Sequence, residues 1–196
     1  MDDNLGRALD EYLVSLSQAG SVDALDGLAR RWTPRLLRYA SRMLAGWGDS
    51  ADAARDVVQE TWVGAVRGLR GLRDPAQFPA WIYGIVTRKC ADAIRAETRR
   101  RRLDAEVAAG DAGEPMPSLT SPERQIDLGN AIRSLPPIHR AVVHLFYRED
   151  LSVEEIASVL GVPAGTVKSR LHHAREEIKR RLAGSGDVTS RGQEIV

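Results

Sequence analysis

The chain has few of the features that mark a secreted, membrane-spanning or disulfide-bonded protein. Only one of its 196 residues, Cys90, is a cysteine, which excludes an internal disulfide and a cysteine-based zinc site and fits a reducing compartment. The first three residues are Met-Asp-Asp, without the basic segment that begins a signal peptide. The longest uncharged apolar stretch in the middle of the chain, residues 78–87, is too short to span a bilayer. These absences predict a soluble cytoplasmic protein.

The sequence also lacks the motifs of an enzyme. Aromatic residues make up 5% of the chain, which favours a helical protein over a β-sandwich. It contains no glycine-rich phosphate loop and no nucleophile elbow. His139 and His144 are five residues apart and do not share a helical face, while His172 and His173 are adjacent and point about 100° apart on a helix. Neither pair suits a metal ion, so we expect no catalytic site, no metal and no cofactor.

Charge is strongly segregated along the chain, although the formal net charge is only +1. Residues 1–29 carry six acidic and one basic side chain, and residues 30–102 carry sixteen basic and seven acidic ones. Residues 103–123 have five acidic and no basic side chains, and residues 124–182 have ten basic and seven acidic ones. Two basic blocks joined by an acidic connector indicate two modules that touch a polyanion. Ordinary solvated faces are the alternative, but they explain the first basic block poorly.

Hydrophobic periodicity predicts an all-α protein. Its expected architecture is two small helical domains joined by a flexible acidic linker, the second domain containing a helix-turn-helix. We expect a frayed leading helix in the N-terminal extension, and in the first domain a helix from residue 25 that is interrupted near Pro34, followed by helices over 49–69 and about 78–100. The expected parts are an acidic N-terminal extension (1–24), a first domain (25–102), a linker (103–121), a second domain (122–183) and a flexible tail (184–196).

The most informative stretch is 151–175, which predicts two short helices and a tight turn. Ser152 and Glu155 form a capping box at the start of the first helix. Gly161 ends that helix because glycine accepts the left-handed conformation. Pro163 fits the next helix start, where no amide partner is needed. Val167 and Leu171 then begin the buried stripe of the second helix.

The outer face of that second helix carries cations and hydrogen-bond donors. A rigidly held helix with such a face is suited to lie in the major groove of DNA. An ordinary helical hairpin with a solvated basic face is the alternative, and it is disfavoured because Ala157, Gly161 and Thr166-Val167 occur together with the basic face. The candidate DNA-contacting residues are Lys168, Ser169, Arg170, His172, His173 and Arg175.

A second candidate surface follows residue 78, where aromatic residues precede a basic helical stripe. Such a surface can stack the bases and neutralise the phosphates of an opened strand. Trp81 alone is more often a core residue than a stacking platform, and the run of four arginines at 99–102 is also compatible with a solubilising helix end. The residues of this surface are Trp81, Tyr83, Arg88, Asp92, Arg95 and Arg99.

In order and spacing these motifs resemble the extracytoplasmic-function (ECF) sigma factors, the small two-domain initiation subunits of bacterial RNA polymerase. The resemblance covers residues 25–182. The matching stretches are 56–62, 78–83, Asp92 with the arginines after it, 134–137, 151–157 and 161–171.

The resemblance implies a role for each part of the chain. One face of the second strong helix would dock on the clamp of the largest polymerase subunit, through Asp56, Gln59, Glu60 and Val63. The helix that begins at residue 78 and the loop before it would capture the non-template strand of the −10 element, and the helix-turn-helix would read the −35 element. The acidic linker would thread towards the RNA exit channel. Family members of this kind are often held silent by an anti-sigma partner.

The chain departs from the family pattern at some of these positions. Arg88 stands where the family commonly has an asparagine, which changes the chemistry offered to a captured base. Ala53 and Arg55 dilute the acidic run that usually precedes the position of Gln59. His172 and His173 form a pair whose base preference the sequence does not reveal.

Two other protein classes share some of these features. A helix-turn-helix regulator of another class, such as a response regulator, would need an α/β domain upstream, whereas the first hundred residues show helical periodicity. A helical bundle that only binds other proteins is the remaining alternative, and binding that does not depend on DNA would support it.

Overall fold

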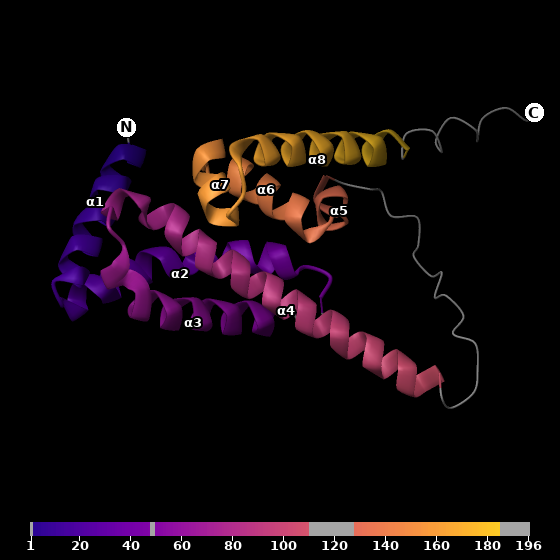
Figure 1. The fold of residues 1–196 in the computed structure, drawn as a ribbon, viewed down its shortest axis with the longest axis horizontal. Coiled ribbons are helices and arrows are strands. Elements are labelled where there is room, and N and C mark those ends of the chain that lie inside the picture. The colour runs from indigo at the N-terminus through magenta and orange to yellow at the C-terminus, as the bar shows by residue number, and fades with distance from the viewer. Residues whose placement is uncertain (1, 48–49, 110–127, 185–196) are drawn as a thin grey trace, which may run out of the picture.

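The computed structural model describes residues 2–47, 50–109 and 128–184, and every regular element in these residues is a helix (Figure 1). This confirms the predicted all-α class. None of the helices in this part of the chain is long and apolar enough to cross a membrane. The elements are α1 (Asp2–Gln18), α2 (Val22–Leu44), α3 (Ser50–Gly68), η1 (Leu69–Gly71), η2 (Pro75–Gln77), α4 (Phe78–Ala109), α5 (Leu128–Arg133), α6 (Pro137–Tyr147), α7 (Val153–Leu160) and α8 (Ala164–Gly184).

The leading segment is a packed helix rather than the frayed one that its weak pattern suggested. Helix α1 lies against α2, η2 and η1, and Val14 on its inner face is fully buried. The Asp10 carboxylate, of which 5% is exposed, accepts a bond of 2.8 Å from Arg31 Nε of α2. Because Asp10 is acidic and yet buried beside Arg31, a pattern of apolar residues alone underestimates how closely this helix is packed.

Helix α2 runs without interruption through Pro34, contrary to the predicted break. Ser21 caps its first turn by accepting a bond from the amide of Ala24. A proline inside a helix removes one backbone bond and costs about 3 kcal/mol. Burial of the apolar stripe on both sides of the proline, including Trp32 and Leu36, offsets this cost.

Helix α4 is longer than predicted and reaches Ala109, well into the segment expected to be linker. Glu97 bonds Arg100 and Arg101 at 2.9 and 2.8 Å, and these two bonds lower the pKa of Glu97 to about 2. Ion pairs at spacings of three and four support a helix. The rest of the predicted linker and the predicted tail lie mainly outside the described residues.

The C-terminal module contains the predicted helix-turn-helix. Ser152 and Glu155 form both bonds of the capping box at the start of α7. Gly161 ends α7 in the left-handed conformation, with φ of 63°. In α8 the side chains of Val167 and Leu171 are buried, so α8 is anchored along one face and presents the opposite face to solvent.

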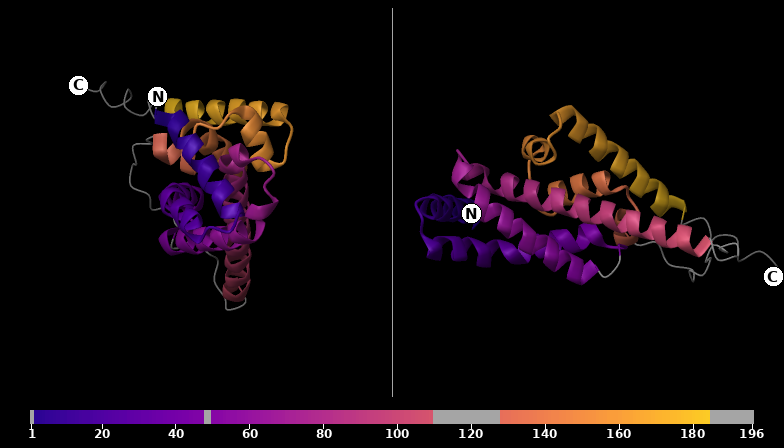
Figure 2. Two further views of the ribbon diagram at one scale, coloured as in Figure 1. Left: turned by 90° about the vertical axis from the view of Figure 1, so that its left-hand side faces the viewer. Right: turned by 60° about the horizontal axis from the view of Figure 1, so that its bottom comes forward.

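The N-terminal module (α1 to α4) and the C-terminal module (α5 to α8) pack against each other and share one hydrophobic core. Helix α7 lies on α4, and α6 lies on α2, so the C-terminal helices form a layer over the N-terminal ones (Figures 1 and 2). The two helices come into close contact at Gly84 of α4, where a Cβ atom would lie 3.6 Å from the backbone oxygen of Val159 in α7. The shared core includes Tyr39, Tyr83, Val142, Leu145 and Ile156.

Polar bonds between the modules centre on Glu149, in the connection between α6 and α7. Its carboxylate accepts a bond from the Tyr83 hydroxyl of α4 and pairs with Arg42 Nη1 of α2 at 3.3 Å. Nearby, the buried Arg140 donates from Nη1 to the carbonyl oxygen of Ala45 at 3.1 Å. Glu149 thus joins both long helices of the N-terminal module to the C-terminal module.

Replacing Glu149 by alanine should weaken the contact between the modules. The variant leaves the buried Tyr83 hydroxyl and Arg42 without their acceptor, at a cost of about 1–3 kcal/mol in the free energy of unfolding. Urea unfolding of the full chain measures this loss. Glu176→Ala, which removes an exposed glutamate of α8, should change stability by less than about 0.5 kcal/mol. Equal effects of the two substitutions would contradict the assignment.

Stability should also fall as the solution becomes acidic, because of His144 in α6. Burial, then Arg42, Arg140 and Arg148, lower the pKa of His144 to about 4 from its ordinary 6.5. Between these values the unfolded chain binds a proton that the folded chain does not. Stability is therefore complete above about pH 6.5 and falls towards pH 4, by up to about 1.4 kcal/mol per pH unit.

Urea unfolding at pH 7 and pH 5 measures this dependence. His144→Gln should reduce the difference between the two pH values, because glutamine does not titrate. His172→Gln, at an exposed position of α8, should leave the difference as in the unmodified chain. A His144→Gln variant with an unchanged pH dependence would overturn the explanation.

Candidate nucleic-acid and polymerase interface

The exposed face of α8 brings together most of the residues predicted to contact a −35 element. Lys168, Ser169, His172 and His173 are all exposed, while Val167, Leu171 and Ala174 are buried on the opposite side. The hydroxyl of Ser169 donates to the carbonyl oxygen of Thr166 at 3.0 Å. This face offers an ammonium group, a hydroxyl and two imidazoles on one rigid surface, which suits hydrogen bonding to base edges and phosphates.

Two arginines of the same set have different surroundings. Arg175 donates from Nε to the Tyr147 hydroxyl at 2.7 Å, and its guanidinium lies over the Tyr147 ring. Arg170 is half-buried, and its Nη1 atom has no hydrogen-bond partner among the described residues. Arg175 is therefore oriented by an aromatic residue of α6, whereas Arg170 lies at the edge of the exposed face.

A histidine that the sequence analysis did not assign to DNA lies beside the α8 face. His139 of α6 stacks on His173 with ring centroids 6.4 Å apart. Burial, then the nearby His173 and Arg170, lower the pKa of His139. His139 thus packs beside the ring of His173, and its imidazole is harder to protonate than that of an ordinary histidine.

The outer face of α4 presents four of the six residues predicted for the −10 element. Arg88, Asp92, Arg95 and Arg99 are exposed. Arg95 is paired with Asp92 within the helix, whereas Arg88 and Arg99 have no ion-pair partner in the part of the chain that the structure describes. These two guanidiniums are available to phosphates or to a base.

A pocket of about 200 Å³ opens at the start of α4, beside Arg88. Trp81 forms one wall and packs closely on Gly68 of α3, where a Cβ atom would lie 3.1 Å from the tryptophan ring. The resemblance implied that the loop before α4 takes part in strand capture, and Leu72 and Gln77 of this connection line the pocket. The lining residues are Leu72, Gln77, Ala80, Trp81, Gly84, Arg88 and Ser158.

Tyr83 is directed away from this surface. Only 2% of the residue is exposed, its hydroxyl bonds Glu149, and its ring meets the Tyr39 ring edge-on with centroids 5.3 Å apart. Burial and the neighbouring Glu149 raise the pKa of Tyr83. In this arrangement Tyr83 connects the two modules and does not face solvent.

Helix α3 presents the face predicted to bind the polymerase. Asp56, Gln59, Glu60 and Val63 are all exposed on it, and Glu60 pairs with Lys89 of α4 at 2.7 Å. Val66, which the sequence analysis did not single out, is 55% exposed. Asp56 and Glu60 with Val63 and Val66 thus form one exposed surface that is both acidic and apolar.

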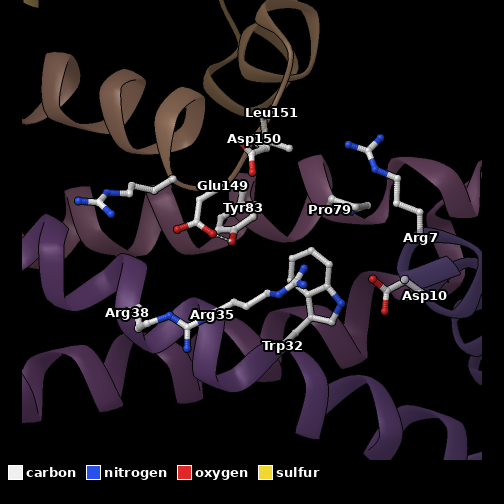
Figure 3. A pocket seen from close by; sticks show the side chains of 12 residues that line it. Arg7, Asp10, Trp32, Arg35, Arg38, Pro79, Tyr83, Glu149, Asp150 and Leu151 are labelled. Atoms are coloured by element: carbon white, nitrogen blue, oxygen red, sulfur yellow. Dashed lines mark hydrogen bonds between the residues drawn. The ribbon is translucent and has the colours of Figure 1, made fainter. Parts of the chain in front are cut away.

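A larger pocket of about 440 Å³ lies where the two modules and α1 meet (Figure 3). The sequence analysis did not identify it, because its walls come from segments far apart in the chain. In Figure 3 the Arg35 side chain lies over the Trp32 ring, with its guanidinium 5.2 Å from the ring centroid. The charged residues of both signs that line it are Arg7, Asp10, Arg35, Arg38, Arg148, Glu149 and Asp150.

Comparison with known proteins identifies the two modules. Residues 28–100 match the family Sigma-70 region 2, and residues 125–178 match the family Sigma-70, region 4. The chain is 34% identical over 177 residues to the ECF RNA polymerase sigma factor SigE of Mycolicibacterium smegmatis, covering 87% of this chain and 66% of that relative. It is 32% identical over 185 residues to the RNA polymerase sigma-H factor of Pseudomonas aeruginosa, covering 88% and 93% of the two chains.

The fold agrees with this relationship. The structure of CnrH in complex with the cytosolic domain of CnrY superposes with a TM-score of 0.64 at 25% identity, covering 90% of this chain and 98% of that one. The first family match spans α2 to α4, and the second extends into α8. The chain therefore belongs to the sigma-70 family of RNA polymerase sigma factors, as a member of its ECF type.

Proposed function

We propose that this protein directs core RNA polymerase to specific promoters and helps to open the −10 region during transcription initiation. The observation that carries the proposal is the exposed face of α8, where Lys168, Ser169, His172 and His173 project from a helix whose other side is buried in a helix-turn-helix. Such a helix enters the major groove, so this face reads the −35 element, with Arg170 and Arg175 flanking it.

The start of α4 captures the non-template strand of the −10 element. A base in a duplex hides its edge, so a strand reader needs a pocket for an unstacked base and cations for the phosphates. The cavity between Trp81, Gln77 and Arg88 can hold the unstacked base. Arg88, Arg95 and Arg99 supply the cations for the phosphates. Arg88 offers a guanidinium with five donors where an asparagine would offer an amide, which favours a base edge rich in acceptors.

The α3 face docks on the clamp of the largest polymerase subunit. Its acidic residues Asp56 and Glu60 would meet basic side chains, and Val63 would provide apolar contact area. The two DNA readers are individually weak, and the polymerase raises their combined affinity by holding both on one promoter.

Promoter binding requires the modules to separate. Ser158 of α7 forms one wall of the −10 pocket, and α7 covers the adjoining surface of α4 at Gly84. A strand cannot reach this side of the pocket while α7 remains there. Binding to the polymerase therefore includes the free energy of breaking the contacts of Glu149, Tyr83 and Arg42.

The same arrangement supports control by an anti-sigma partner that holds the closed state. The similar protein CnrH is known in complex with the cytosolic domain of CnrY, and a partner that bridges the two modules would oppose their separation. The protein acts in the cytoplasm as a binding subunit and has no catalytic activity of its own. Its ligands are core polymerase and promoter DNA.

Run-off transcription with core RNA polymerase on a pool of genomic promoter fragments tests the proposed function. Adding the protein should produce specific start sites. Lys168→Ala should reduce them by about 5- to 150-fold, because it removes a contact worth about 1–3 kcal/mol. Asp56→Lys should reduce them similarly by placing a like charge against the clamp.

Two charge-matched controls accompany these variants. Arg180→Ala removes an exposed cation from the distal part of α8, and Asp26→Lys reverses an exposed carboxylate on α2; both should retain transcription. Fragments retained by the protein alone, without start sites, would instead identify a stand-alone helix-turn-helix regulator. Neither starts nor retention, with core polymerase bound, would contradict the proposal.

The separation of the modules makes a further prediction for Glu149→Ala. Because the open form is the one that binds, the apparent dissociation constant rises as the open fraction falls. A loss of about 1.4 kcal/mol in the contact between the modules should tighten binding of a −10 single strand by about tenfold. Fluorescence anisotropy of a labelled oligonucleotide measures this, and Glu176→Ala should bind as the unmodified protein does. Weaker or equal binding by Glu149→Ala would show that α7 does not obstruct the strand.

A further inference from the structure

One wall of the pocket beside Arg88 belongs to a short irregular segment, which is anchored by the buried Leu69 and by packing against α1. Residues 69–77 form the connection between α3 and α4 and contain the two single-turn helices η1 and η2. Leu72 and Gln77 of this connection line the pocket, facing Trp81 and Arg88. Most of the connection is exposed, so its position depends on bonds from neighbouring elements.

The side chain of Gln18, the last residue of α1, supplies such bonds. Its Nε2 atom donates to the carbonyl oxygen of Leu69 at 2.9 Å and to that of Leu72 at 2.7 Å. The amide nitrogen thus uses both of its hydrogens on two carbonyls that flank the η1 turn. The Leu69 oxygen also accepts the backbone amide of Leu72 at 3.1 Å, so the three residues form one bonded unit.

Gln18 is itself held firmly in place. Helix α1 is closed after Gln18 by the bond from the Ser21 amide to the Leu16 carbonyl oxygen, 3.0 Å long. Gly20 makes this turn possible with φ of 102°, a conformation that favours glycine. Buried Val14 and the ion pair between Asp10 and Arg31 fix the helix on α2. The Gln18 side chain therefore extends from a helix end that is fixed in position.

We propose that Gln18 is a positioning residue for promoter recognition: it fixes the 69–77 connection so that the pocket holds the captured −10 base against Arg88 and Gln77. This inference rests on the proposed function of the pocket. Gln18 acts through the connection, because both hydrogens of its amide nitrogen are used on the carbonyl oxygens of Leu69 and Leu72. Helix α1 is thus part of the −10 reader, and its contribution lies in base discrimination.

Anisotropy titrations with −10 single strands that carry each of the four bases in turn at every position test this role. Gln18→Leu removes both donors and should lower the ratio of affinities for the best and worst base by about tenfold. Gln18→Glu places a carboxylate against two carbonyl oxygens and should have a larger effect. Gln18→Lys retains donors for both carbonyls and should restore most of the discrimination. Ser15→Ala, an exposed position of α1 whose hydroxyl bonds only the Glu11 carbonyl oxygen, should match the unmodified protein.

Four further measurements separate positioning from general damage. Gln18→Leu should bind the −35 duplex and core polymerase normally, and in urea unfolding the loss of its two hydrogen bonds should lower the free energy of unfolding by no more than about 1–3 kcal/mol. Hydrogen exchange of the amides in residues 69–77 should accelerate. Unchanged discrimination and exchange in Gln18→Leu would overturn the inference while leaving the proposed function intact, and so would a loss of binding equal for all bases. A protein that binds no −10 strand, even with core polymerase, would overturn both.

Discussion

Burial of apolar side chains around α4 is the interaction on which the rest of the structure depends. Ile82, Val86 and Cys90 of this helix are fully buried, and α2, α3 and α7 all pack against it. Because hydrophobic stabilisation scales with the apolar area removed from water, α4 holds both modules in one core. The helix proposed to capture the promoter strand is therefore also the helix that packs against both modules.

Helix α4 both holds the shared core together and carries the surface proposed to bind the promoter strand, so stability and function depend on the same helix. In the closed arrangement Tyr83 and Glu149 bond each other across the modules, and the backbone of α7 lies over Gly84. The contact combines this bond with apolar packing in the shared core. The proposed separation of the modules would have to replace both, and the Glu149 carboxylate would be well solvated once the modules are apart.

Much of the fold could be predicted because it depends on local patterns. The capping box at Ser152, the left-handed Gly161 and the stripe of Val167 and Leu171 each act within a few residues, and each occurs in the structure as expected. The errors arose where distant contacts override local preference. Pro34 does not interrupt α2, because packing on both sides offsets the lost bond. Helix α1 is packed, because the partner of Asp10 is Arg31 of the next helix.

The residues of the candidate site also fall into a group that local patterns predict and a group that they do not. Residues on one exposed helical face, such as Lys168 with His172 or Asp56 with Glu60, could be grouped from their spacing, because helical periodicity alone places them together. The walls of the pocket beside Arg88 could not be grouped from spacing. The resemblance indicated the loop before α4 but not Leu72 and Gln77 within it, and Ser158 comes from the other module.

By itself, the sequence determined the helical class, the helix-turn-helix and the charged faces, because these follow from local propensity and periodicity. Only the tertiary structure decided that the modules share a core, that Tyr83 faces Glu149 rather than solvent, and that Gln18 bonds the connection that lines the pocket beside Arg88. These features depend on contacts between residues 51 to 66 positions apart, and no local pattern encodes which of many possible partners will meet.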